Sequence, residues 1–208
     1  MINKVKIFGE RCSGTNYLEK LLIKNLRGVT VLHESQDFGW KHNIVYQENW
    51  SSLYDVLFLY IYRNPYDWLR SLYLQPHHMP QMKELSFLDF LQANANVYEG
   101  NEMIDSSRNV FQSRAMSIVD ALHLRNKVPN MMIISYEDLN NNPQMIFEIA
   151  KKYQLSARED FVNIDTYKGI GEKYQPKQYE ELPDEIVTYI KEHLDWDLEE
   201  KLLSEYMV

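Results

Sequence analysis

Residues 9–16 constrain the fold of this chain more than any other stretch, because they join a short apolar segment directly to a helical pattern. The apolar segment at residues 5–8 is typical of a strand, and leucines recur at helical spacing within residues 15–26. Gly9 and Gly14 allow the chain to turn tightly between the two. A helix N-terminus directs N–H groups and partial positive charge at its surroundings, so the sequence predicts a loop that wraps a phosphate group.

The glycine spacing of this loop matches G-x-x-x-x-G-K-[ST], which holds nucleoside triphosphates. Thr15 stands where that loop requires lysine, and Asn16 stands where it requires the hydroxyl that holds magnesium. The cation within the loop is Arg11, whose planar guanidinium suits phosphate or sulfate oxygens. The pattern therefore favours a phosphate-bearing ligand over metal-dependent phosphoryl transfer.

Length and composition favour one domain spanning residues 1–208, large enough to bury a core. No run of eighteen apolar residues occurs, so we expect no membrane span, and the sequence enters a strand pattern without a secretory signal. Cys12 is the only cysteine, which excludes an internal disulfide and fits a reducing compartment. We therefore expect a cytoplasmic protein, whose oligomeric state the sequence leaves open.

The net charge of −8 argues against broad nucleic-acid binding, which relies on a basic face. The charge is unevenly distributed along the chain. Residues 1–75 contain nine Lys and Arg against seven Asp and Glu, a net of +2, whereas residues 76–208 contain thirteen against twenty-three, a net of −10. An anion site is therefore predicted in the first third of the chain.

Strand and helix patterns alternate along the sequence. Strands are expected at residues 5–8, 29–32, 56–62 and 131–134, and the unbroken apolar run at 56–62 suits a strand covered on both faces. Helices are expected at 15–26, after Asn64-Pro65, near 87–91, at 107–125, after Pro143, and near 185–194 and 198–206. This alternation predicts a three-layer α/β/α fold with a mainly parallel sheet, a P-loop-like nucleotide-binding fold.

Ligands of such sheets bind at the carboxyl ends of the strands. Candidate side chains follow each predicted strand: Arg11, Lys41 with His42, Arg63 and Tyr136. We therefore expect these side chains to line one site.

Three segments of the chain, RCSGTNY at 11–17, YRNPYDWLRSLY at 62–73 and SYEDL at 135–139 with Asn142-Pro143 after it, carry a resemblance to a known family. They resemble motifs of the sulfotransferases that use 3′-phosphoadenylyl sulfate (PAPS). The first is similar to the family's 5′-phosphosulfate loop. The second is similar to its 3′-phosphate segment, where an Arg and a Ser eight positions later hold that phosphate. The third resembles its YEDL…NP strand-to-helix segment.

The resemblance implies that PAPS is the co-substrate and that 3′,5′-adenosine bisphosphate (PAP) is the product. It implies metal-free transfer of a sulfuryl group to a hydroxyl or amine of a small molecule or a glycan, with a carbohydrate as the favoured acceptor. The segment YKGIG at 167–171 is reminiscent of the family's basic segment that closes over the 3′-phosphate. The nucleotide-binding residues that the resemblance implies are Arg11, Cys12, Ser13, Gly14, Thr15, Asn16, Tyr17, Arg63, Ser71, Tyr136 and Lys168.

The acceptor hydroxyl must lose a proton, and we assign His42 as the base and Lys41, with Arg11, as cations for the sulfate oxygens. His33 is the rival base. The chain departs from the family pattern twice, because Lys41 and His42 are adjacent and because Cys12 separates Arg11 from Ser13.

Two other functions share parts of this pattern. A small nucleotide kinase would use the same sheet and loop, but the missing loop lysine speaks against it. A non-catalytic module that binds PAP or another nucleotide would retain the pocket without turnover. The spacing of His and Cys residues supports no metal site.

Overall fold

The computed structural model describes residues 1–32, 38–44, 49–99, 102–166 and 179–206. At its centre lies a four-stranded, all-parallel sheet with the strand order β2-β1-β3-β6. The strands are β1 (Lys4–Gly9), β2 (Thr30–Leu32), β3 (Val56–Tyr62) and β6 (Met131–Ser135). The four predicted strands and their parallel arrangement are thus confirmed.

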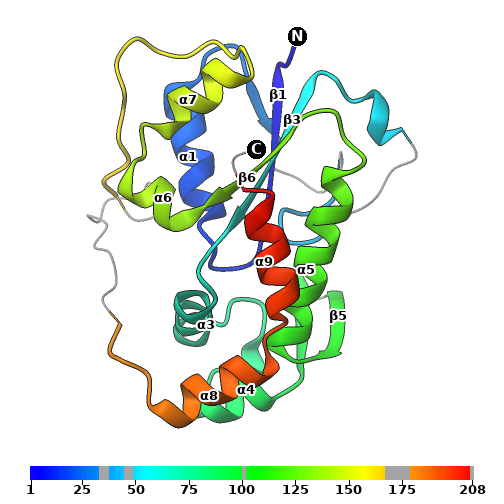
Figure 1. Cartoon of the computed structure of the whole chain (residues 1–208), viewed down its shortest axis with the longest axis vertical. Coiled ribbons are helices and arrows are strands. Elements are labelled where there is room, and N and C mark those ends of the chain that lie inside the picture. Colours follow the sequence, from blue (N-terminus) through cyan, green and yellow to red (C-terminus); the bar gives the residue numbers. More distant parts are fainter. Residues whose placement is uncertain (33–37, 45–48, 100–101, 167–178, 207–208) are drawn as a thin grey trace.

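Helices cover both faces of this sheet (Figure 1). One face packs against α1 (Thr15–Asn25), α6 (Tyr136–Asn141) and α7 (Met145–Lys152), and the other against α5 (Val110–Arg125) and α9 (Trp196–Ser204). Each face has its own apolar cluster, which confirms the predicted three layers.

The central strand β3 shows why an unbroken apolar run forms there. Leu57, Leu59 and Ile61 point into the first cluster, and their neighbours Phe58 and Tyr60 point into the second. Every residue of β3 is buried, because a strand covered on both faces has no side open to water.

A further group of helices lies beyond the carboxyl ends of the strands (Figure 1). It comprises α3 (Pro65–Leu74), α4 (Phe87–Gln92) and α8 (Asp184–His193). The 3-10 turn η1 (Trp50–Ser52) precedes β3, and the 3-10 turn η2 (Pro80–Met82) lies between α3 and α4 in the sequence. The helices α3, α4 and α8 share a third apolar cluster with the start of α5. Asn64 caps α3 as expected, since its side chain accepts hydrogen bonds from the N–H groups of Tyr66 and Asp67 at 3.0 and 3.4 Å.

The predicted helix at residues 107–125 begins later than the sequence indicated. Residues 107 and 108 belong to β5 (Glu102–Arg108), which forms an antiparallel hairpin with β4 (Ala95–Glu99) that the sequence pattern did not reveal. The helix begins at Val110 because Asn109 and Gln112 form a reciprocal capping box. Smaller shifts occur at α1, which ends one residue earlier than predicted, and at α9, which begins and ends two residues earlier than predicted because Asp195 caps its start.

The strand register brings the predicted site residues to one edge of the sheet. Gly9 lies opposite Ile61, and Ile61 lies opposite Ile134. The residues that follow these three strands therefore meet at the carboxyl edge of the sheet. In the part of the chain that the structure describes, no helix is long and apolar enough to cross a membrane.

Candidate functional site

The loop between β1 and α1 is held by hydrogen bonds to its carbonyl groups. The Gly9 carbonyl accepts from His42 Nδ1 at 2.6 Å, and the Glu10 carbonyl accepts from Ser13 Oγ at 2.7 Å. Farther along, the Arg11 carbonyl accepts from Trp68 Nε1 at 2.8 Å, and the Cys12 carbonyl accepts from Arg63 Nη1 at 3.2 Å. Four successive carbonyls are thus engaged, which fixes the path of the loop.

The loop meets α1 without a side-chain cap. Gly14 occupies the N-cap position with φ 101°, a left-handed conformation that glycine adopts at little cost. A Cβ at this position would overlap the ring of Tyr136, so Gly14 also permits close packing against α6. The N–H groups of Thr15 and Asn16 donate to no other described residue. The start of α1 therefore offers unsatisfied donors, as an anion-binding helix N-terminus does.

Arg63 extends from the end of β3 across this loop. Its guanidinium lies 4.6 Å above the ring of Tyr136, and Nη2 donates to the Tyr179 hydroxyl at 3.4 Å. Tyr179 also stacks on Arg70 of α3, at 5.3 Å. The Nε atoms of Arg63 and Arg70 are buried and make no hydrogen bond among the described residues, although Glu137 lies 4.0 Å from Arg63 Nε and Asp67 lies 4.0 Å from Arg70 Nη2. Buried donors of this kind usually have a partner, so the pair of guanidinium groups suits an anion.

The adjacent residues Lys41 and His42 both reach the loop. The Lys41 carbonyl accepts from the Gly9 N–H at 3.0 Å, and the Lys41 ammonium donates to Asn16 Oδ1 at the start of α1. A lysine from another segment thus stands beside the helix N-terminus that has Thr15 in place of the usual lysine. The expected grouping of Arg11, Lys41 and His42 is present.

The indole ring of Trp40 contacts three basic side chains. The guanidinium of Arg11 stacks 4.7 Å from its ring, and the rings of His42 and His78 meet it edge-on at 4.6 and 5.2 Å. This cation–π contact with Trp40 holds the Arg11 guanidinium beside the loop.

His42 is held as a neutral imidazole. Burial lowers its pKa from 6.5 to about 3, and the nearby Arg11, Lys41 and His78 add to this shift, while the hydrogen bond to the Gly9 carbonyl opposes it. Because the Gly9 carbonyl accepts a hydrogen bond, Nδ1 carries the proton and Nε2 carries the lone pair.

Three buried charged side chains, Arg114, Glu10 and Glu199, form a cluster next to the loop. Arg114 of α5, with 1% of its surface exposed, donates from Nη1 to Glu10 Oε2 at 2.6 Å. It also binds Glu199 of α9 through two bonds, from Nε to Oε1 at 2.5 Å and from Nη2 to Oε2 at 2.9 Å. A further bond from Nη2 reaches the Arg63 carbonyl at 3.0 Å. One guanidinium thus connects the loop, β3, α5 and α9.

Glu10 titrates near neutrality in this cluster. Burial raises its pKa from 4.5 to about 7, Arg114 opposes the shift, and the carboxylate of Glu199 adds to it. The pKa of Arg114 is raised, because the two carboxylates outweigh the effect of burial. Arg114 therefore stays charged, whereas the raised pKa of Glu10 brings its proton exchange near neutral pH.

A cavity of about 90 Å³ lies between this cluster, the loop and α3. Glu10, Arg11 and His42 contribute polar atoms to its wall. The rest of the lining comes from α3, from the segment after it, from the end of β5 and from the first half of α5: Trp68, Leu72, Met79, Arg108, Val110, Ser113 and Ser117. The cavity combines a carboxylate, an imidazole and two guanidinium groups beside the loop.

Glu10 and His42 have opposite effects on stability between pH 7 and pH 5. The folded-state pKa of Glu10 is raised to about 7, so the fold gains stability as the pH falls from about 7 toward 4.5. The folded-state pKa of His42 is lowered to about 3, so stability is lost as the pH falls below about 6.5. Each effect amounts to roughly 2 kcal/mol over this interval, and the two nearly cancel.

Single replacements should separate these two effects. Relative to the unmodified protein, Glu10→Gln should lose roughly 2 kcal/mol of unfolding free energy between pH 7 and pH 5, and His42→Gln should gain a similar amount. Urea unfolding at the two pH values measures both, and the double variant should again follow the unmodified protein. Single variants whose pH dependence equals that of the unmodified protein would contradict the shifted pKa values.

Of the other site residues predicted from the sequence, four lie in the described structure and two lie outside it. Ser71 is buried on α3, and its hydroxyl makes no hydrogen bond to Arg63 or another described residue. Tyr17 packs against the apolar cluster beneath α1. Ser13 is buried in the loop, and Thr15 is buried at the start of α1. Lys168 and His33 lie outside the described residues, so their predicted roles stay predictions.

The structure adds several residues to the site that the sequence did not indicate. Glu10 lies between strand and helix in the sequence, but a carboxylate is not expected in an anion-binding loop, so the sequence does not predict it as a site residue. Arg70 and Tyr179 gave no spacing signal, since they join the site through the tertiary fold. Arg114 and Glu199 are 85 positions apart and have no local pattern.

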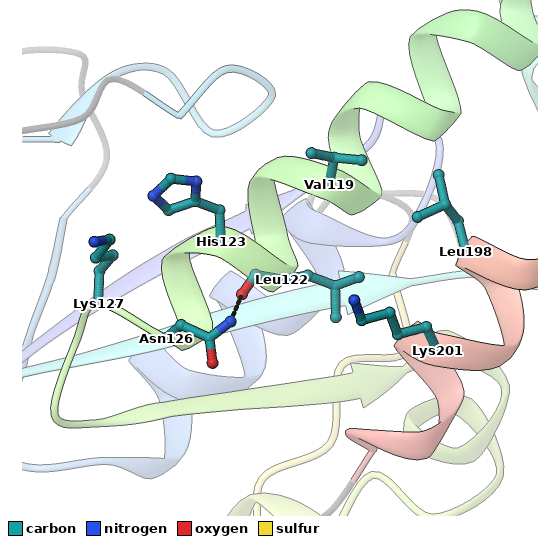
Figure 2. A pocket seen from close by; sticks show the side chains of 7 residues that line it. All are labelled: Val119, Leu122, His123, Asn126, Lys127, Leu198 and Lys201. Atoms are coloured by element: carbon teal, nitrogen blue, oxygen red, sulfur yellow. Dashed lines mark hydrogen bonds between the residues drawn. The ribbon is translucent and has the colours of Figure 1, made fainter.

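A larger cavity, of about 360 Å³, lies between α5 and α9 (Figure 2). Figure 2 shows Leu122 and Lys201 directed into the space between the two helices, with Val119 and Leu198 at its upper edge. His123, Asn126 and Lys127 complete its lining. The side chains lining this cavity include no carboxylate, so the cavity does not provide the mixed acid and base groups of the loop site.

Comparison of the chain with models of protein families and with curated protein sequences finds no match. Among the described residues, no group of three or more His, Cys, Asp or Glu side chains is arranged to hold a metal ion.

Proposed function

We propose that this protein is a sulfotransferase that moves a sulfuryl group from PAPS to a hydroxyl or amine acceptor. The proposal rests on one observation. The three segments that resemble sulfotransferase motifs meet at the loop between β1 and α1. Tyr136 packs on Gly14, and Arg63 donates to the Cys12 carbonyl while it stacks on Tyr136. Segments that lie far apart in the sequence thus contribute to one site, which is what a nucleotide with two phosphate groups requires.

The residues present fit the two anionic ends of PAPS. Unsatisfied N–H groups at the start of α1, with Arg11 and Lys41 near them, suit the 5′-phosphosulfate. The buried Nε atoms of Arg63 and Arg70 suit the 3′-phosphate. Tyr136, beside Arg63, provides an aromatic ring near the nucleoside.

The proposed chemistry relies on positioning and on charge stabilisation. During transfer, negative charge develops on the leaving phosphate and on the sulfate oxygens, and fixed donors stabilise it without reorganising. The loop N–H groups, Arg11 and Lys41 supply such donors. Losing one typically costs roughly 3–4 kcal/mol of barrier stabilisation. The sequence-based role of His42 as base stays a prediction, and the low pKa of its imidazole makes it a weak one.

A nucleotide kinase is the second candidate, and one observation favours it. The Lys41 ammonium, which donates to Asn16, could replace the missing loop lysine. Position 16 still lacks the hydroxyl that holds magnesium in such enzymes. Arg63 and Arg70 would also have no second phosphate to bind in a nucleoside triphosphate without a 3′-phosphate.

Titration calorimetry with PAP and with ATP and magnesium distinguishes the two. We expect PAP to bind more tightly than ATP with magnesium, and we expect radiolabelled PAPS to transfer its sulfate to members of a panel of sugars, phenols and amines. Tighter binding of ATP with magnesium would favour the kinase. Tight PAP binding with no transfer and no hydrolysis would favour a non-catalytic module, and no PAP binding would overturn the proposal.

A further inference from the structure

We propose that Glu10 is the proton acceptor of the reaction and that the cavity beside the loop receives the acceptor hydroxyl. This inference rests on the proposed sulfuryl transfer and names a catalytic residue that the sequence motifs do not indicate. It follows from the charge balance of the buried cluster and from the groups that line the cavity.

The buried cluster carries one negative charge in excess. Arg114 binds the carboxylates of both Glu10 and Glu199, and all three side chains are almost fully buried. One guanidinium cannot neutralise two carboxylates, so the cluster takes up a proton readily. A buried group that binds a proton readily at neutral pH suits a general base.

Glu10, rather than Glu199, is placed to accept the proton of the acceptor hydroxyl. Both carboxylate oxygens of Glu199 accept hydrogen bonds from Arg114, at 2.5 and 2.9 Å. Glu10 receives one, at Oε2, and the described residues provide no hydrogen bond to its Oε1. Glu10 also lines the cavity, whereas Glu199 does not.

His42 is the other candidate base in the same cavity. Its ring is buried among Arg11, Lys41 and His78, and its pKa of about 3 lies far below the operating pH of most enzymes. The pKa of Glu10, about 7, lies where a general base is most efficient. His42 then positions the loop, since its Nδ1 donates to the Gly9 carbonyl next to Glu10.

The charged and titratable groups around Glu10 come from every element packed against it: Arg114 from α5, Glu199 from α9, Tyr60 from β3, and Arg11 within the loop. His42 and Arg108 face the same cavity. At about 90 Å³ the cavity has room for on the order of three water-sized groups. It therefore suits the small hydroxyl-bearing end of an acceptor whose remaining part lies outside.

In the proposed step the acceptor oxygen forms a bond to the sulfur of PAPS. The bond between sulfur and the bridging oxygen breaks, and its electron pair stays on the phosphate of PAP. The proton of the acceptor hydroxyl moves to the carboxylate of Glu10, which later releases it to solvent. No oxidant or reductant takes part.

The test measures the pH dependence of turnover with radiolabelled PAPS, using water and methanol as probes small enough for the cavity. In the unmodified protein kcat should rise with pH through about 7, as Glu10 ionises. Glu10→Gln should lower kcat by roughly 10²–10⁴-fold and abolish this rise. PAP affinity should change less than about threefold, because Glu10 faces the acceptor and not the nucleotide.

Glu199→Gln is the matched variant, since it removes a carboxylate from the same guanidinium but not from the cavity. Arg114 then pairs with Glu10 alone, so the rise of kcat should persist and move to lower pH. His42→Gln should retain the rise. If Glu10→Gln folds, binds PAP and keeps the rise, the role of Glu10 is overturned while sulfuryl transfer stands. If the unmodified protein binds PAP but transfers sulfate to neither probe nor to the acceptor panel, sulfuryl transfer itself fails.

Discussion

Replacing Arg114 with methionine is expected to lower the free energy of unfolding by about 3–5 kcal/mol at pH 7. The guanidinium is 1% exposed and is the common partner of Glu10 and Glu199. Without it two buried carboxylates lose the guanidinium that both of them bind. Methionine keeps most of the apolar volume beside Trp68, whose ring lies 4.8 Å from the guanidinium, so the loss reports charge and hydrogen bonding more than packing.

Urea unfolding measures this loss, and Arg125→Met on the same helix is the control. Arg125 pairs with the half-exposed Glu205 at 3.6 Å and donates from Nη1 to the Met131 carbonyl at 2.6 Å, so its replacement should cost about 1–2 kcal/mol. Adding Glu10→Gln and Glu199→Gln to Arg114→Met should recover a large part of the stability, since the stranded charges are then gone. A loss no greater than that of the control would mean that water or another group already compensates the two carboxylates.

The fold was predictable to the extent that its signals are local. The apolar run of β3 and the Asn64 cap of α3 each depend on a few neighbouring residues, and both formed as expected. The hairpin of β4 and β5 was missed because residues 95–108 show no clear alternation of polar and apolar residues. The sequence therefore predicts helix at residues 107 and 108, which form the end of β5.

Site residues could be predicted from the sequence only where a side chain of suitable chemistry directly follows a strand. Arg63 and Tyr136 follow strands whose register brings them to one edge, so the strand order implied that they meet. The pairing of Lys41 with Asn16 depends on the path of an irregular segment, which has no sequence rule. The cluster around Arg114 joins residues 85 and 104 positions apart, and long-range charge pairing of this kind leaves no periodic trace.

Arg63→Ala is expected to weaken PAP binding by about 100-fold or more. Its side chain is 12% exposed, and its buried Nε makes no hydrogen bond among the described residues, with the Glu137 carboxylate 4.0 Å away. In the proposed complex it would form a desolvated, charge-assisted contact with the 3′-phosphate. Truncating one partner of such a contact typically costs about 2–5 kcal/mol, and about 2.7 kcal/mol corresponds to 100-fold. Arg63→Lys should restore only part of the affinity, because an ammonium cannot make the two parallel bonds of the planar guanidinium.

Comparing two ligands identifies which phosphate Arg63 binds. The unmodified protein should prefer PAP to adenosine 5′-monophosphate, which lacks the 3′-phosphate, and Arg63→Ala should abolish that preference while binding of the monophosphate changes little. Arg158→Ala, at an exposed arginine near the far end of α1, should keep the preference intact. Equal losses for both ligands in Arg63→Ala would instead mean that Arg63 shapes the loop through its bond to the Cys12 carbonyl, and that the 3′-phosphate has another partner.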